Sequence, residues 1–423
     1  MGKSNRIFYG WWVLVALFFS CTSIAISPFP VILKPLMNEF HTGRGPVSAM
    51  LFIYFLSAAI GSFIIARFLE HHSPRKFLLW GSLIGGTCYL LCSLTQNLWH
   101  LYVLYAIMGV AINGILPLAM VALASRWFKR RRGMATGIAF AGPSVLIMAL
   151  IPAVGFIAQH FGWRATYLFA GLLTLAICVP LHWLVTRDTP EEIGLLPDGV
   201  KPDELKIIDT FKPVTEAAII DKKVSLSSYF RHLPIWAVCF IIPFVVIGEI
   251  AIQQHEVSFI TDMGIPATLA ATAFGFTSGL SGLGKFISGS LTDKISTRYI
   301  AVIFLIIELV GMIILMHAKT MATVWIFVIV YGIGSGTMGT LFPLMVRDIF
   351  GSTNFNTVFG LGNATFMCGI ALGTPLAGFI FDATGSYHWV FIIVAILFAI
   401  AMVTIYSLYG LNPRPWRNLR KQR

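Results

Sequence analysis

Long apolar stretches recur along the whole chain and are separated by short polar segments. Twelve windows approach or exceed the ~20 residues that an α-helix needs to cross the hydrocarbon core of a bilayer. Backbone polar groups must be satisfied internally inside lipid, so we expect a helix even where a window holds Gly or Pro. The predicted spans are 9–33, 46–69, 77–94, 99–125, 134–159, 164–186, 232–257, 267–291, 299–317, 321–346, 354–381 and 387–410. The pattern predicts an all-α integral membrane protein with twelve transmembrane helices.

The composition excludes a soluble globular protein. Hydrophobic residues make up 57% of the 423 residues, charged residues make up 11%, and the mean hydropathy is +0.82. The first apolar run is too long for a secretory signal and lacks a small-residue cleavage site, so we expect an uncleaved first span. Cys88 and Cys92 share a helix face, but no histidine or acid stands at ligand spacing, which favours packing over a metal site.

The net charge of +12 could indicate a nucleic-acid partner, but the placement of the charges favours another explanation. In the twelve-span topology one side holds Lys3, Arg6, Arg75, Lys76, Arg126, Lys129, Arg130, Arg131, Arg132, Lys294, Arg298, Arg347, Arg414, Arg417, Arg420, Lys421 and Arg423. The other side holds only Lys34, Arg44, Arg164 and Lys319. The positive-inside rule then predicts that both termini are cytoplasmic, in a cell inner membrane or plasma membrane, with the bilayer and not nucleic acid as the partner.

The chain divides into two related halves. A polar segment over 188–231 is predicted to be a cytoplasmic linker between an N-terminal bundle, 1–187, and a C-terminal bundle, 232–423. Matching segments recur 223 positions apart: ARFLEHHSPRK at 66–76 with GSLTDKISTRY at 289–299, and GFIAQHFG at 155–162 with GFIFDATG at 378–385. Tyr105 and Pro117 recur as Tyr331 and Pro343 at an offset of 226. Parallel repeats of this kind occur in transporters whose substrate site lies between the two halves.

Two of these segments resemble the cytoplasmic signature of the major facilitator superfamily, which has a small residue, an acid four positions later and then basic residues. The second copy reads Gly289, Asp293, Lys294 and Arg298, whereas the first is degraded to Ala66, Glu70, His71 and Arg75. The resemblance implies two six-helix bundles that rock about a central site. It also implies that Glu70, Arg75, Asp293, Lys294 and Arg298 form a cytoplasmic gate.

Further motifs resemble the branch of monocarboxylate porters and oxalate/formate exchangers. They are YGWW at 9–12, VILKPLMNEF at 31–40, SRWFKRRRGMATGIAFAG at 125–142, FGWR at 161–164, DTPEEIGLLPDG at 188–199 and GTPLAGFIFDATGSY at 373–387. Membership implies a carrier for small organic acids. In this branch the eighth helix carries a substrate-binding cation, and Gly284, Lys285 and Gly289 match its pattern with lysine in place of arginine.

Lys285 lies in an apolar, small-residue span, where a charge costs ~3 kcal/mol or more. Such residues usually face a cavity and serve it, so we expect Lys285 to bind the substrate carboxylate. The alternative is a structural lysine, neutralised by a partner or snorkelling along its stem. A single ammonium neutralises one carboxylate, and the eleventh span holds no second cation, which predicts a monoanionic cargo.

The seventh span carries Glu249, Gln253 and Glu256 on one polar face. Burial disfavours a charged carboxylate, so Glu249 is a candidate proton acceptor coupled to Lys285, with a static ion pair as the alternative. We expect Glu256, nearer the outer end, to be solvated. The branch has a histidine near the substrate at this position, so the resemblance makes His255 a candidate substrate ligand; a capping histidine is the alternative.

Three other polar positions complete the candidate site. Asn113 in the fourth span stands where the branch often has a polar residue, although it could equally serve helix packing. Glu308 in the ninth span is either a proton-coupling residue or a protonated residue bonded to a neighbour. The branch often has an aspartate one turn before the eighth-helix cation, but here that residue is Ser281, which shifts the expected proton relay to Glu249.

The sequence holds neither a phosphate-cradling motif nor a metal cluster at ligand spacing, so we expect no cofactor and no enzymatic activity. Three functions remain. The first is a carrier of small monocarboxylates such as lactate or pyruvate, by proton symport or anion exchange, working as a monomer. The second is an efflux antiporter for a larger amphipathic compound, because GIAFAGP at 137–143 partly resembles the antiporter motif. The third is a transporter-like sensor.

Overall fold

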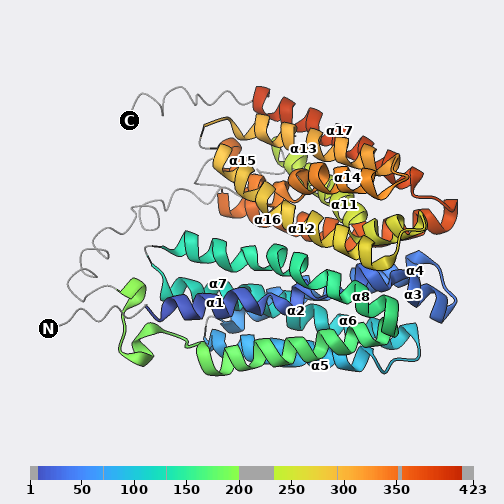
Figure 1. Ribbon diagram of the computed structural model, residues 1–423. Helices are drawn as coiled ribbons and strands as arrows, with labels where there is room; N and C mark the ends of the chain where they lie inside the picture. Colours follow the sequence, from blue (N-terminus) through green and yellow to red (C-terminus); the bar gives the residue numbers. More distant parts are fainter. Residues whose placement is uncertain are drawn as a thin grey trace.

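The computed structural model describes residues 8–69, 71–129, 131–199, 233–292, 294–350 and 355–411, and every regular element in these ranges is helical. Figure 1 shows two bundles of roughly antiparallel helices lying against each other, one from each half of the chain. The N-terminal bundle contains α1 (Gly10–Ser20), α2 (Thr22–Ala25), α3 (Phe29–Phe40), α4 (Arg44–Leu69), α5 (Pro74–Cys92), α6 (Leu98–Met108), η1 (Gly109–Ile115), α7 (Leu116–Trp127), α8 (Arg132–Pro180) and η2 (Leu181–Val185).

The C-terminal bundle contains α11 (Leu233–Asp262), α12 (Ala267–Leu291), α13 (Thr297–Met316), α14 (Met321–Gly334), α15 (Thr337–Phe350), α16 (Phe355–Thr384) and α17 (His388–Leu411). Among the described residues, eight helical stretches are long and apolar enough to cross a membrane. One of them, Met134–Val185, has 52 residues and turns at Gly162, whose φ of 81° is left-handed, so it makes two crossings. With α5, α11 and α12, the predicted twelve spans are confirmed.

The boundaries differ most at the first span, predicted to end at 33. The structure continues this span through α1, α2 and α3 to Phe40. The helix ends at His41, which adopts a left-handed conformation with φ of 48°. Polar Lys34, Asn38 and Glu39 lie within the added turns, which is why an apolar window stops short of them.

One helix in each half is irregular near its middle. The fourth span passes through a π-helical segment, η1, and the tenth span is broken between α14 and α15 at Ser335 and Gly336, where Gly336 has φ of 71°. At the repeat offset of 226, Gly109 corresponds to Ser335, so both irregularities begin at the same place in the two halves. Interrupted spans at corresponding positions of two repeats often mark the substrate site of a transporter.

The two bundles meet along α8 with α12 and along α4 with α16, through small residues. A Cβ on Gly155 would stand 2.4 Å from the Cβ of Ala271, and one on Gly282 would stand 2.9 Å from Ser144. Every hydrogen bond and ion pair printed between described residues of opposite bundles lies at the end of the molecule that holds 34–48, 159, 255–268 and 374–387. We call this the far end, and the opposite end, where α1 begins and α17 ends in Figure 1, the terminal end.

At the terminal end, the first residues of the predicted linker are ordered against the N-terminal bundle. The side chain of Asp188 accepts hydrogen bonds from the Ser73 hydroxyl and, at 3.0 Å, from the Arg75 backbone N–H at the start of α5. Asp198 accepts from the Lys129 backbone N–H at 2.9 Å. The rest of the linker lies outside the described residues, and its predicted boundaries remain a prediction.

Candidate functional site

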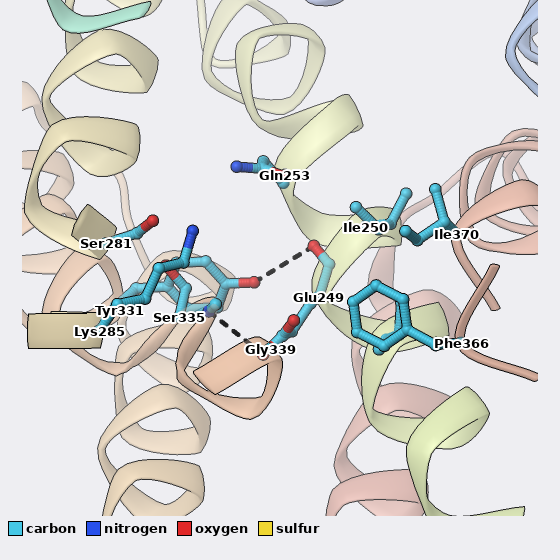
Figure 2. A pocket seen from close by; sticks show the side chains of 12 residues that line it. Glu249, Ile250, Gln253, Ser281, Lys285, Tyr331, Ser335, Gly339, Phe366 and Ile370 are labelled. Carbon is cyan, nitrogen blue, oxygen red and sulfur yellow. Dashed lines mark hydrogen bonds between the residues drawn. The ribbon is translucent and has the colours of Figure 1, made fainter. Parts of the chain in front are cut away.

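A cavity of about 180 Å³ opens in the C-terminal bundle beside the break between α14 and α15. Figure 2 shows it from close by, with Ser281 and Lys285 of α12 on one side and Glu249, Ile250 and Gln253 of α11 on the other. It is lined by Val246, Glu249, Ile250, Gln253, Ser281, Lys285, Tyr331, Ser335, Gly336, Gly339, Phe366 and Ile370. The structure therefore brings together Lys285 and Glu249, the two residues on which the predicted site mainly rests.

Lys285 reaches this cavity because two glycines make room for it. A Cβ on Gly284 would stand 2.0 Å from the Ile333 carbonyl oxygen, so the missing side chain lets α12 and α14 approach closely. A Cβ on Gly336 would stand 2.6 Å from the Lys285 Cε and 3.1 Å from its Nζ. The lysine stem thus lies over the break in the tenth span. Of the described residues that line the cavity, Lys285 is the only Lys or Arg.

Glu249 faces the same break from α11. Its Oε1 accepts a hydrogen bond from the Gly336 backbone N–H at 3.2 Å, and its backbone oxygen accepts one from the Tyr331 hydroxyl at 3.4 Å (Figure 2). The side chain is buried. Glu249 and Lys285 both line the cavity, yet the structure places no ion pair between these two described residues; Gly336 contacts both. The static ion pair left open by the sequence is not seen in this conformation.

This arrangement suits a small monoanion. The ammonium of Lys285 supplies one positive charge, and the Gln253 amide and Ser281 hydroxyl add neutral hydrogen-bonding groups on opposite walls (Figure 2). Phe366 and Ile370 of α16 close the cavity with apolar surface. A carboxylate entering here meets one counter-charge, polar groups that can orient it and an apolar wall for its carbon chain.

Lys285 follows the glycines that pack α12 against α8 of the other bundle. Gly279 and Gly282 of α12 lie against Met148 and Ser144 of α8, whereas Lys285 stands one turn further toward the terminal end. On the facing bundle, a Cβ on Gly137 would meet nothing within 4 Å. The printed polar contacts between the bundles thus lie at the far end, and Lys285 stands on the terminal-end side of the glycines that pack α12 against α8.

Other predicted site residues do not line this cavity. Asn113 lies in η1, on the N-terminal side; at the offset of 226 it corresponds to Gly339, which does line the cavity. Glu308 lies behind the cavity on α13, fully buried beside Gly334. Glu256 was expected to be solvated, and that expectation is wrong: it has 0% exposure and accepts a hydrogen bond from the Thr277 hydroxyl at 2.9 Å, because this face of α11 packs on α12.

His255 belongs to the closure at the far end. The Arg44 guanidinium donates to the Tyr387 hydroxyl, which can donate to the His255 Nδ1 at 2.7 Å, and the His255 Nε2 can donate to the Thr374 carbonyl at 2.9 Å. A neutral imidazole with its proton on Nε2 satisfies this whole chain. The Arg44 Nη2 also donates to both carboxylate oxygens of Asp262, at 2.9 and 2.8 Å, and the guanidinium lies 3.6 Å from the centre of the Phe381 ring. The structure thus places His255 in contacts that join the bundles.

The predicted cytoplasmic gate is only partly described. Glu70 and Asp293 lie outside the described residues. Arg75 donates from its guanidinium to the carbonyl oxygens of His182 and Trp183, within its own bundle. Lys294 is exposed, and Arg298 lies over the Tyr299 ring at 4.4 Å. These contacts leave the gating role of all five residues a prediction.

The chain is similar in sequence to known membrane transporters. The family model described as Major Facilitator Superfamily matches residues 13–346 and 256–423. The chain belongs to this superfamily. It is 26% identical to monocarboxylate transporter 4 of Rattus norvegicus over 91% of this chain and 80% of the relative, and 23% identical to monocarboxylate transporter 13 of Bos taurus over 91% and 86%.

These relatives agree with the motifs that indicated the monocarboxylate porter branch, and they identify a transporter and not an enzyme. Among solved structures, the fold is similar to that of a bacterial homologue of the human lysosomal transporter Spinster in an inward-facing, unoccupied conformation. The TM-score is 0.68 at 16% identity, over 97% of this chain and 96% of that one.

Sequence reasoning missed the contribution of the tenth span to the site. Tyr331, Ser335, Gly336 and Gly339 line the cavity, and none was a predicted site residue. A signal was present: GVAINGILP at 109–117 and SGTMGTLFP at 335–343 are glycine-containing segments that end in proline at corresponding positions of the two repeats. Such paired interruptions predict broken helices at a substrate site.

Proposed function

We propose that the chain is a secondary active transporter of small monocarboxylates, such as lactate or pyruvate, that works by alternating access. The observation that carries this proposal is Lys285, the only Lys or Arg among the described residues that line a small cavity beside the break between α14 and α15. A charge in a membrane interior is costly unless it faces a cavity or a partner. The names of the relatives, monocarboxylate transporters 4 and 13, support the same substrate class.

The number of charges in the cavity favours monoanions over dianions. Lys285 neutralises one carboxylate, and Glu249 already lies on the opposite wall. The second carboxylate of oxalate would remain unpaired in a poorly solvated site. The volume of about 180 Å³ also suits a small acid better than a large amphipathic compound.

The positions of the basic residues indicate how the protein is oriented in the membrane. With the termini in the cytoplasm, as the positive-inside rule predicts, the far end faces outward and the terminal end faces the cytoplasm. The pairing of Arg44 with Asp262 then closes the outer entrance. Transport requires these contacts to break while the terminal end closes, and we assign that second closure to Glu70, Arg75, Asp293, Lys294 and Arg298. One chain holds both bundles, so we propose a functional monomer.

We assign proton coupling to Glu249. When a monoanion pairs with Lys285, Glu249 is left as an uncompensated buried charge unless it takes up a proton. Binding of the anion and the proton together keeps the cavity neutral, so we favour proton symport. Exchange of one bound anion for another is then a partial reaction that needs no proton release.

Counterflow of labelled acids into proteoliposomes tests the proposal. The purified full-length protein is loaded with unlabelled lactate and offered labelled lactate, pyruvate, formate or oxalate, with protein-free liposomes as the control. We expect lactate and pyruvate to accumulate well above oxalate. Oxalate counterflow that exceeds lactate and pyruvate, or no counterflow of any monocarboxylate, would overturn the proposed substrate class.

A further inference from the structure

Glu308 is a buried acid with no role in the mechanism above. It lies in the middle of α13 with 0% exposure, and its backbone packs against α14 so closely that a Cβ on Gly334 would stand 2.8 Å from the Glu308 N. Neither carboxyl oxygen has a hydrogen-bond donor among the described residues. An ionised carboxylate in this position would lack the counter-charge and the donors that such a group needs.

Two polar side chains approach the Glu308 carboxyl: the Glu249 carboxyl and the Tyr331 hydroxyl. The Tyr331 hydroxyl donates to the backbone oxygen of Glu249 at 3.4 Å, so its proton is already engaged. The Glu249 carboxyl is then the group left to bond to Glu308. Two neighbouring carboxyl groups in a buried site repel each other when both are ionised, which favours a proton on one of them.

The surroundings decide which carboxyl is protonated. Glu249 accepts from the Gly336 backbone N–H and shares its cavity with the ammonium of Lys285, both of which stabilise a carboxylate. Glu308 has neither. Two other titratable groups lie near the pair. Tyr331 is on α14. Glu256 is on α11, seven residues after Glu249, and accepts a hydrogen bond from Thr277 of α12.

We infer that Glu308 stays protonated and donates a hydrogen bond to the carboxylate of Glu249 when the substrate site is empty. Glu308 is then a positioning residue that lowers the proton affinity of Glu249 from behind the cavity. This inference rests on the proposed function. In the empty site the charges of Lys285 and Glu249 cancel. In the loaded site the monoanion pairs with Lys285 and Glu249 carries one proton. One proton therefore accompanies each anion, and Glu308 is neutral in both states.

Two substitutions separate donation from mere space filling. Glu308→Gln keeps a neutral donor of the same shape, whereas Glu308→Leu removes the donor and keeps apolar bulk. Without the donated bond the Glu249 carboxylate is less stable, so Glu249 retains its proton to a higher pH. Proton-driven lactate uptake falls as the external pH rises past the point where Glu249 loses its proton. The pH at which uptake falls to half should be unchanged in Glu308→Gln. In Glu308→Leu it should rise by about one pH unit.

Lactate counterflow at constant pH is the companion measurement for both variants, because exchange reports binding at Lys285 and needs no proton release. We expect Glu308→Gln and Glu308→Leu to retain counterflow. Absence of counterflow in the wild-type protein would be a failure of the proposed function and not of this inference. Unshifted profiles in both variants would show that no such bond exists. A shift in Glu308→Gln as large as in Glu308→Leu, or uptake driven by sodium ions instead of protons, would also overturn it.

Infrared spectroscopy tests the proton itself, independently of transport and even if Glu308→Leu folds poorly. The wild-type protein at neutral pH should show the carbonyl stretch of buried protonated carboxyl groups, and this band should lose the contribution of one carboxyl in Glu308→Gln, while any contribution of the buried Glu256 remains. A band that persists at full intensity in Glu308→Gln would place the proton elsewhere and overturn the assignment.

Discussion

Gln159 and Asp382, which occupy the same position in the two sequence repeats, each cap the first turn of a helix in the opposite bundle. Asp382 accepts from the backbone N–H groups of Arg44 and Gly45 at 2.7 Å each, at the start of α4. Gln159 accepts from the backbone N–H of Thr268 at 3.2 Å, at the start of α12. Gly45 and Thr268 are themselves 223 positions apart. The contacts that close the far end therefore follow the same pseudo-twofold symmetry as the sequence.

Asp382→Ala should shift the protein toward conformations that are open at the far end. The caps exist only when the bundles meet there, so their loss weakens the closed state alone. Loss of an N-terminal cap costs ~1 kcal/mol, which corresponds to about a fivefold change in the ratio of open to closed molecules. The ratio can be measured from the distance distribution between spin labels on His41 and Ser386, after replacement of the exposed Cys368.

Gln159→Ala is the matched control for this prediction. Its neutral amide makes a weaker cap than the charged Asp382 side chain, which also favours the positive end of the helix dipole, so we expect a smaller shift in the same direction. An unchanged distance distribution in Asp382→Ala would show that the caps do not contribute to the closure.

His255→Phe should leave substrate affinity nearly unchanged while it destabilises the closed far end. His255 does not line the cavity that holds Lys285, but the substitution leaves the Tyr387 O–H without an acceptor and removes the contact of the His255 Nε2 with the Ser48 hydroxyl of the opposite bundle, at 3.4 Å. Each buried unpaired group costs ~1–3 kcal/mol, so the open population should rise at least about fivefold. The same spin-label distance reports the population, and equilibrium binding of labelled lactate reports the affinity.

A large loss of lactate affinity in His255→Phe, without a change in the open population, would instead make His255 a substrate ligand, as the family resemblance implied. The two measurements thus separate a gating histidine from a binding histidine.

Gly284→Ala should destabilise the C-terminal bundle, although alanine is the better helix former. The added methyl group would stand 2.0 Å from the Ile333 carbonyl oxygen, so α12 and α14 must move apart. Overpacking of this kind costs ~1–3 kcal/mol. Gly137→Ala is the control, because a Cβ there meets nothing within 4 Å and the helix gains propensity. Thermal unfolding of the purified proteins should show a lower Tm for Gly284→Ala only; equal Tm values would mean that the contact relaxes without cost.

The fold was predictable because each span carries its own signal. An apolar window of sufficient length has one stable conformation in lipid, so twelve helices could be placed without knowledge of their packing. The repeats then predicted two bundles, and the position of Lys285 in an apolar span indicated a cavity. None of these steps depends on which helices touch.

The features that sequence reasoning missed all depend on helix rotation and contact. Glu249 and Glu256 lie on one face of α11, yet the first reaches the cavity and the second packs against Thr277 of α12. His255 was placed near the substrate by resemblance, but its imidazole contacts the Tyr387 hydroxyl and the Thr374 carbonyl at the far end. The contribution of Gly336 depends on a break in the tenth span that composition alone does not locate.

Lys285→Ala should abolish substrate binding, because the carboxylate would then enter the cavity without a counter-charge and Glu249 would lose its partner on the opposite wall. A loss of ~3 kcal/mol corresponds to more than a hundredfold weaker Kd for lactate. Lys285→Arg keeps the charge, but the bulkier guanidinium must fit beside Gly336, which already lies close to the lysine Cε, so partial activity is expected. Lys319→Ala, an exposed lysine outside the cavity, should bind as the wild-type protein does. Equilibrium binding of labelled lactate measures all three, and near wild-type affinity in Lys285→Ala would show the lysine to be structural.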